Sequence, residues 1–175
     1  MNDLFSRMIP RAPALLALLA LASCGADKIV PPCPPVRIDN ATAVLTKFKD
    51  GAAQDMANME YRAELVGYKG QCTFKDDRVE LSMDIDFAFE PGPAAGGATK
   101  VPYFVAIPQF YPRAEGKRVL EFAAPSGKGA QRVREANITT VIPLKKDEPA
   151  ASYDVYIGLQ LTQQQLDYNR AHPAR

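Results

Sequence analysis

Very few side chains in this chain of 175 residues are of the types that carry catalytic or metal chemistry. The chain has one histidine, His172, and it lies in a polar segment near the C-terminus. A single histidine in such a segment argues against catalytic triads, histidine-rich zinc sites and histidine acid–base pairs. We therefore expect no catalytic residue and a protein that is not an enzyme.

Four acidic side chains have a spacing that could hold a hard cation. Glu80, Asp84, Asp86 and Glu90 are separated by even numbers of residues, so they share one face of a strand, and calcium and magnesium prefer carboxylate oxygens. An alternating acidic face is more often simply hydrated, and the sequence has no EF-hand loop pattern. We expect no bound metal ion and no cofactor.

The first of three cysteines, Cys24, follows an apolar run of ten residues, Ala12–Leu21. A helix that crosses a bilayer needs about 20 apolar residues, so a run of this length is typical of a secretory signal peptide. An N-terminal helix of the fold itself is the alternative. The four residues Leu21-Ala22-Ser23-Cys24 resemble the lipobox of bacterial lipoproteins at every position.

The resemblance implies that residues 1–23 are a signal peptide and that Cys24 is acylated and becomes the lipid anchor. Several acyl chains hold a protein firmly, since each buried methylene contributes about 0.8 kcal/mol. By the family's sorting rule, Gly25 implies the outer membrane, with the domain facing the periplasm; the inner membrane is the alternative. The chain is also similar to uncharacterised envelope lipoproteins with β-sandwich domains.

The two other cysteines, Cys33 and Cys72, predict a disulfide, because an even pair in an exported protein is usually bridged. A catalytic redox pair is the alternative, but it typically has a Cys-x-x-Cys spacing near a helix start, which these residues lack. Residues 24–35 are rich in proline and predict an extended tether behind the acylated cysteine.

Strands dominate the rest of the chain. Val79–Glu90 alternates strictly between apolar and polar side chains, which predicts a strand with one buried face. Thr162 and Gln165 have the spacing of a capping box, which predicts a helix from Gln163 to about Ala171. Further strands are expected at 60–74 (or a strand with a short return), 101–107, 118–123, 132–144 and 153–161, and a helical turn or loop at 55–59.

About seven strands separated by glycine and proline turns predict a mainly β domain over residues 36–175. The expected architecture is an antiparallel β-sandwich, immunoglobulin-like as the commonest form, with a short C-terminal helix. A small β-barrel is the alternative. The Cys–Trp–Cys arrangement of antibody domains is excluded, because the chain contains no tryptophan.

The charge is nearly balanced overall but unevenly distributed. A net charge of +1 argues against a general nucleic-acid binder, which needs a basic excess. Without residues 1–23, which carry Arg7, Arg11 and Asp3, 19 basic and 19 acidic side chains remain. Within this neutral chain, Asp76–Glu90 has a net charge of −5 and Arg113–Lys146 a net charge of +5.

Two interpretations of this charge segregation stay open. The two segments could pair across one sheet, where opposite charges attract. Alternatively, a basic patch could face anionic lipid headgroups, glycan or an acidic partner. The residues of such a patch would be Lys117, Arg118, Arg132 and Arg134.

These observations together favour a non-catalytic structural or accessory subunit of an envelope assembly. It would be bound to the membrane through the acyl chains on Cys24 and to an envelope protein partner. A binding module for anionic glycan or lipid headgroups, acting through Arg113–Lys146, is the alternative, and an enzyme with desolvated carboxylates is a third. No nucleic-acid partner is expected.

Overall fold

The computed structural model describes residues 31–97 and 99–172. The chain divides into two units, Met1–Val30 and Pro31–Arg175, and all of the described residues belong to the second. The predicted signal peptide, the lipid anchor Cys24 and the tether up to residue 30 lie outside the described residues.

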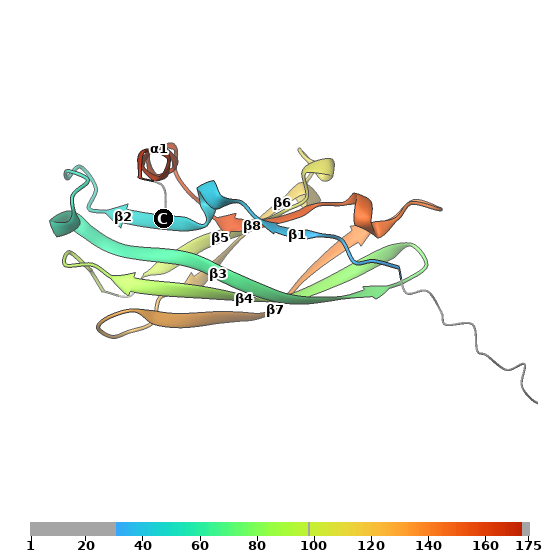
Figure 1. Cartoon of the computed structure of the whole chain (residues 1–175), viewed down its shortest axis with the longest axis horizontal. Coiled ribbons are helices and arrows are strands. Elements are labelled where there is room, and N and C mark those ends of the chain that lie inside the picture. The colour runs from blue at the N-terminus through green and yellow to red at the C-terminus, as the bar shows by residue number, and fades with distance from the viewer. Residues whose placement is uncertain (1–30, 98, 173–175) are drawn as a thin grey trace, which may run out of the picture. The chain divides into compact units, whose positions relative to one another are not determined.

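Two four-stranded sheets make up the domain, which confirms the predicted β-sandwich (Figure 1). Sheet A has the strand order β1-β8-β5-β6 and sheet B the order β2-β3-β4-β7. The sheets do not close into a barrel, so the alternative of a small β-barrel is wrong. The strands are β1 (Val36–Ile38), β2 (Val44–Phe48), β3 (Met59–Phe74), β4 (Arg78–Pro91), β5 (Lys100–Ala106), β6 (Lys117–Ala123), β7 (Gln131–Pro143) and β8 (Val155–Leu159).

The order of the strands combines neighbours in sequence with distant partners, since β1 pairs with β8 and β4 pairs with β7. β2, β3 and β4 form a meander in one sheet, whereas successive strands B and C of an immunoglobulin domain lie in opposite sheets. β1 pairs with β8 in parallel, and the other strand pairs are antiparallel. The chain therefore crosses between the sheets after β1, β4, β6 and β7.

β4 lies at the centre of sheet B and has the predicted alternation. Its apolar side chains point into the sandwich and are at most 4% exposed, while its acidic side chains lie on the outer face. Opposite them, β5 and β8 of sheet A contribute aromatic and branched residues to the same core. The buried residues of β4 are Val79, Leu81, Met83, Ile85, Phe87 and Phe89.

The long strand β3 changes its inward face halfway along its length. A register shift between Leu65 and Gly67 inserts one extra residue opposite β4. Leu65 is paired with the buried Phe87 before this bulge, and Cys72 is paired with the buried Leu81 after it. Before the bulge, the odd-numbered residues of β3 face the core. The extra residue reverses this alternation, so after the bulge even-numbered residues such as Cys72 face the core.

The predicted disulfide between Cys33 and Cys72 is present and joins the two sheets. Cys33 lies three residues before the start of β1 in sheet A, Cys72 lies in β3 of sheet B, and the two Cα atoms are 5.9 Å apart. The Tyr68 hydroxyl adds a second link by donating to the Val36 carbonyl at 3.0 Å. This corner of the sandwich is therefore held by a covalent bond and a hydrogen bond.

Helix α1 (Gln163–Ala171) has the predicted bounds and the predicted capping box. Thr162 Oγ1 accepts from the Gln165 backbone nitrogen, and Gln165 Oε1 accepts from the Thr162 backbone nitrogen. Asn169 Nδ2 donates to the carbonyl of Val44 at 2.7 Å and to that of Ala41 at 3.1 Å. Figure 1 shows α1 beside β2, the edge strand that these bonds protect from pairing with another chain.

Candidate functional site

The four basic residues predicted to form one patch lie on two different edge strands. Lys117 and Arg118 belong to β6 of sheet A, and Arg132 and Arg134 belong to β7 of sheet B. Lys117 Nζ lies 4.7 Å from the centre of the Phe104 ring. Arg118 pairs with the buried Val105 and points between the sheets, where it donates to the Thr139 carbonyl at 2.8 Å. The structure therefore distributes these cations over separate surfaces.

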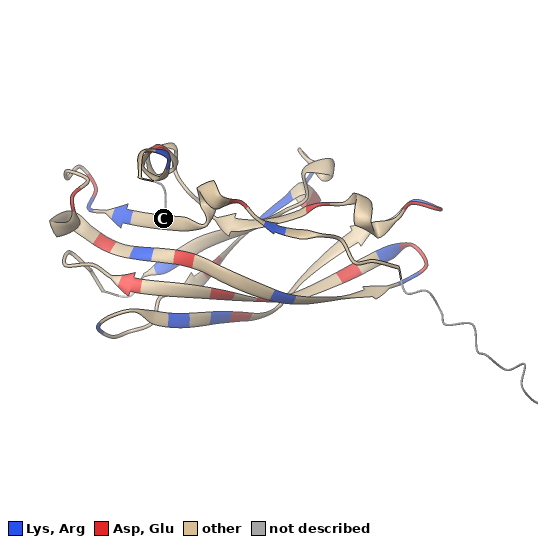
Figure 2. Ribbon diagram, viewed as in Figure 1, with Lys and Arg blue, Asp and Glu red and all other residues tan. Residues whose placement is uncertain are grey.

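Arg134 forms an ion pair with the acidic strand. It lies opposite Asp86 in the register of β4 and β7, and its guanidinium donates to both carboxylate oxygens, at 2.7 and 2.9 Å. The hydrogen bond from Arg134 is the main reason why the pKa of Asp86 is lowered, with the positive charge of Lys69 adding to the effect. This confirms that the acidic strand β4 pairs with the part of the basic segment that lies in β7 (Figure 2).

Two other acidic side chains of this face, Asp84 and Glu80, are also engaged. Asp84 accepts from the Asn137 backbone nitrogen and lies opposite Lys69 in the register with β3. Glu80 accepts from Arg78. Among the described residues there is no group of three or more His, Cys, Asp or Glu side chains placed to hold a metal ion.

The outer face of sheet A is different in character, because its centre is apolar. Phe104 and Val119 are register partners on β5 and β6, and Val119 is 51% exposed. Phe104 lies across Gly158 of β8, since a Cβ atom at that glycine would be only 2.8 Å from the Phe104 ring. We call Phe104, Lys117, Val119 and Tyr156 the sheet A face.

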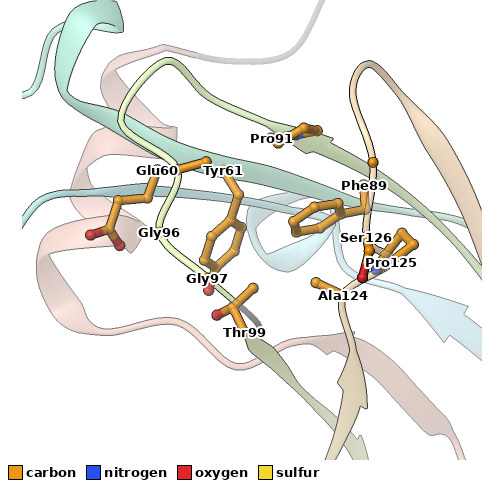
Figure 3. A pocket seen from close by; sticks show the side chains of 12 residues that line it. Glu60, Tyr61, Phe89, Pro91, Gly96, Gly97, Thr99, Ala124, Pro125 and Ser126 are labelled. Carbon is orange, nitrogen blue, oxygen red and sulfur yellow. The ribbon is translucent and has the colours of Figure 1, made fainter.

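A pocket of about 430 Å³ lies at one end of the sandwich, and we call it the end pocket (Figure 3). It is bounded by the start of β3, the end of β4, and the two loops 92–99 and 124–130 that follow β4 and β6. Three separate parts of the chain thus form one concavity. The lining residues used below are Glu60, Tyr61, Phe89, Thr99, Ser126 and Gly127.

The floor of the end pocket is aromatic and its rim is polar. Tyr61 and Phe89 are 8% and 4% exposed, and their ring centres are 5.5 Å apart. Figure 3 shows these rings side by side, with the hydroxyl end of Tyr61 directed towards Thr99. Burial, reinforced by the charge of Glu60, raises the pKa of Tyr61 to about 12, so its hydroxyl stays protonated at neutral pH.

A larger open groove of about 970 Å³ separates α1 from β2 and β3. Its walls combine apolar side chains such as Val44 and Met56 with the charged Arg62 and Glu64. His172, predicted to be exposed, is exposed at the end of this groove and stacks on Tyr168 with ring centres 4.3 Å apart.

The sequence did not identify the end pocket or the sheet A face. Residues 91–100 were recognisable as a loop, but nothing in the local pattern shows that this loop approaches residues 124–127. Tyr61 and Phe89 appear in the sequence as ordinary inward positions of two strands. The one local signal was the glycine pair Gly96-Gly97, which leaves one wall of the pocket without side chains.

Comparison with known proteins gives no match: no family model, no curated protein and no solved structure is similar to this chain. Within residues 31–97 and 99–172, no helix is both long and apolar enough to span a membrane.

Proposed function

We propose that this protein is a lipid-anchored accessory subunit of a bacterial envelope assembly, without catalytic activity of its own. Cys24 would carry the acyl chains, the outer membrane would be the anchoring bilayer, and the sandwich would face the periplasm. The sheet A face would contact an envelope protein partner. The observation that carries the proposal is the contrast between the outer faces of the two sheets.

On sheet B, charged side chains pair with one another, as Asp86 of β4 does with Arg134 of β7 and Arg62 does with Glu64 within β3. Val141 is exposed on this face, but it lies opposite Glu80 in the register of β4 and β7, so its surroundings are charged. On sheet A, Phe104 and the half-exposed Val119 lie together beside Lys117. Exposed apolar groups edged by charge mark interaction surfaces, so the partner would present an apolar centre and a carboxylate for Lys117.

The position of the disulfide supports an anchored role. Because Cys33 is bonded to Cys72, only residues 25–32 would separate the acylated Cys24 from the folded domain. Eight residues in an extended proline-rich conformation reach about 25 Å. The sandwich would therefore stay close to its bilayer and would meet partners that are themselves in or on that membrane.

Binding of anionic glycan or lipid headgroups through Arg113–Lys146 receives less support. That function needs the cations on one surface, whereas Lys117 lies on the outer face of sheet A and Arg134 is paired with Asp86 on sheet B. The subunit hypothesis needs no common basic surface.

Two substitutions of matched valines test the proposal in cells. Val119 on sheet A and Val141 on sheet B are 51% and 47% exposed, and both lie on the outer face of an edge strand. After mild cross-linking and purification, Val119→Asp is expected to lose the partner, and Val141→Asp to retain it. Equal recovery of the partner from both variants would contradict the role of the sheet A face.

The anchor is tested separately by labelling with radioactive palmitate. The wild-type chain is expected to take up the label and to fractionate with the outer membrane, and Cys24→Ala to remain an unlabelled precursor. A Cys33→Ala, Cys72→Ala variant serves as the control, since it should keep the label. Label incorporated into Cys24→Ala would overturn the assignment of the anchor.

A further inference from the structure

We propose that the end pocket binds an uncharged sugar ring, such as the terminal hexose of an envelope glycan. This is a second binding site, separate from the sheet A face and from the predicted basic patch. Four features of the end pocket support the proposal: its shape, its single charge, its aromatic floor and its hydroxyl-bearing rim.

The pocket is preformed, because backbone hydrogen bonds fix both of its loops. Gly92 donates to the Glu60 carbonyl at 2.8 Å, and Ala94 donates to the Met59 carbonyl at 3.0 Å. A Cβ atom on Gly92 would be 2.0 Å from the Met59 oxygen, so only glycine permits this approach. The loop 124–130 is joined to the other wall by the bond from Ala124 to the Thr99 carbonyl at 2.9 Å.

The size of the pocket suits a small ligand. Its volume of about 430 Å³ lies within the roughly 300–1,000 Å³ of known ligand sites. Its upper walls, at Gly96, Gly97 and Ser126, are exposed, while the rings of Tyr61 and Phe89 at the floor are buried. A ligand can therefore enter from solvent and reach an apolar surface.

The charge of the lining selects against anions. Glu60 is the one ionisable side chain among the lining residues that carries a charge at neutral pH. A phosphate or carboxylate placed in the pocket would be repelled by this carboxylate without a compensating cation. The ligand is accordingly neutral, and its hydroxyl groups can donate to Glu60.

The remaining polar groups complement the rim of a sugar. The hydroxyls of Tyr61, Thr99 and Ser126 can each donate and accept. They therefore complement the hydroxyl groups at the edge of a sugar ring, which also donate and accept. The pyranose ring also has an apolar face of C–H groups, and the paired rings of Tyr61 and Phe89 supply the surface for that face.

A further donor lies behind the wall of the pocket. Gln131 Nε2 is buried and has no hydrogen-bond partner among the described residues. It is 3.0 Å from the position that a Cβ atom of Gly127 would occupy. A buried donor of this kind is normally satisfied by a ligand or an ordered water, so its position next to the pocket agrees with a polar occupant.

Saturation-transfer NMR on the full-length chain measures the binding directly. The chain is kept in a detergent without a sugar headgroup, and glucose, galactose, mannose and N-acetylglucosamine are the probes. At least one sugar is expected to receive saturation, most strongly at the C–H protons of one ring face. Propylammonium and glucose 6-phosphate serve as the charged comparisons and are expected to bind more weakly than the best neutral sugar.

Two near-isosteric variants locate the site. Tyr61→Phe removes one hydroxyl and Glu60→Gln removes the charge, and each is expected to weaken sugar binding about tenfold, which corresponds to one hydrogen bond. Glu60→Gln should also narrow the preference for glucose over glucose 6-phosphate. Ser82→Ala, on the outer face of β4, is the control and should bind as the wild type does.

Three results would overturn the proposal: no saturation transfer to any of the four sugars, unchanged affinity in both Tyr61→Phe and Glu60→Gln, or tighter binding of propylammonium than of every sugar. Should either variant fail to give the wild-type circular dichroism spectrum, Thr99→Val on the pocket rim takes its place. An unaltered affinity in Thr99→Val would then count against the site.

Discussion

Asp86 on β4 and Arg134 on β7 face each other in the strand register, and the guanidinium donates to both oxygens of the carboxylate. This pair joins the negative segment of the chain to the positive segment within one sheet. It brings the β7 part of the basic stretch beside the acidic stretch, while Lys117 and Arg118 of the basic stretch lie on β6 of sheet A. It also gives the outer face of sheet B its hydrated character.

The pair predicts a specific pH dependence of stability. The pKa of Asp86 is lowered in the folded state, first by the hydrogen bond from Arg134, so its contribution is present above the unfolded pKa of about 3.9. That contribution is lost as the pH falls through the lower folded pKa. Asp86→Asn should therefore be less stable than the wild type at neutral pH, by a small margin because the pair is exposed.

Urea unfolding at a series of pH values measures this difference. The difference in free energy of unfolding between the wild type and Asp86→Asn is expected to disappear at acidic pH. Asp76→Asn, in the exposed turn between β3 and β4, is the control and should show a smaller gap at neutral pH. A gap that stays constant down to low pH would show that the ion pair is not its cause.

The disulfide predicts a larger effect. Replacing Cys33 and Cys72 by alanine removes a cross-link between residues 39 positions apart, which in the chain-entropy model lowers the free energy of unfolding by about 4 kcal/mol. Chemical denaturation with and without a reductant gives the same comparison for the wild-type chain. Identical midpoints under both conditions would mean that the bridge does not stabilise the fold.

The close packing around Gly158 predicts how much stability is lost when the sheet A face is disturbed. In Gly158→Ala the new Cβ atom would be 2.2 Å from Thr42 Oγ1 and 2.8 Å from the Phe104 ring, so both side chains must move. Overpacking of this kind typically costs about 1–3 kcal/mol. Gly67→Ala is a matched strand control, because nothing lies within 4 Å of its Cβ position.

Thermal unfolding of the two glycine variants distinguishes a local clash from a general effect of replacing glycine in a strand. Gly158→Ala should melt several degrees below the wild type, and Gly67→Ala at or slightly above the wild-type temperature. Less partner should also be recovered with Gly158→Ala after cross-linking and purification, because Phe104 of the sheet A face has to move. Equal melting temperatures for both variants would contradict the proposed packing of Phe104 on Gly158.

The hydrogen bonds of Asn169 predict that this side chain stabilises the packing of α1 on β2. Asn169→Ala removes both hydrogen bonds to the carbonyls of Ala41 and Val44, at a cost of about 1–2 kcal/mol. Hydrogen exchange should then accelerate in α1 while the centre of sheet B stays protected. Gln163→Ala, at the other end of the helix, is the control, and equal exchange in the two variants would argue against the role of Asn169.

The sequence predicted the features that depend on neighbouring residues. The alternation of Val79–Glu90 and the capping box of Thr162 and Gln165 are both local patterns, and both are confirmed. The disulfide was predicted because the chain is expected to be exported and only two cysteines remain after Cys24, which leaves one pairing. The first two features depend on residues close in sequence, whereas the disulfide joins residues 39 positions apart and was predicted from the number of cysteines.

Features that depend on distant residues could not be predicted in this way. The bulge at Leu65–Gly67 is defined by the register with β4, so it was visible beforehand only as glycines that could bend the strand. Pairing of β1 with β8 brings Arg37 to Asp154 across 117 positions of sequence. The end pocket and the sheet A face likewise combine residues from several strands and loops, and no local pattern connects them.

Photo-cross-linking in living cells tests the central claim most directly. The photoreactive amino acid p-benzoylphenylalanine is placed at Val119 in one strain and at Val141 in another, in chains that retain Cys24. We predict that position 119 gives a discrete cross-link to an envelope protein and that position 141 gives little or none. Absence of a cross-link at Val119, or cross-links of equal yield at both positions, would contradict the account of this protein as an anchored subunit that binds through sheet A.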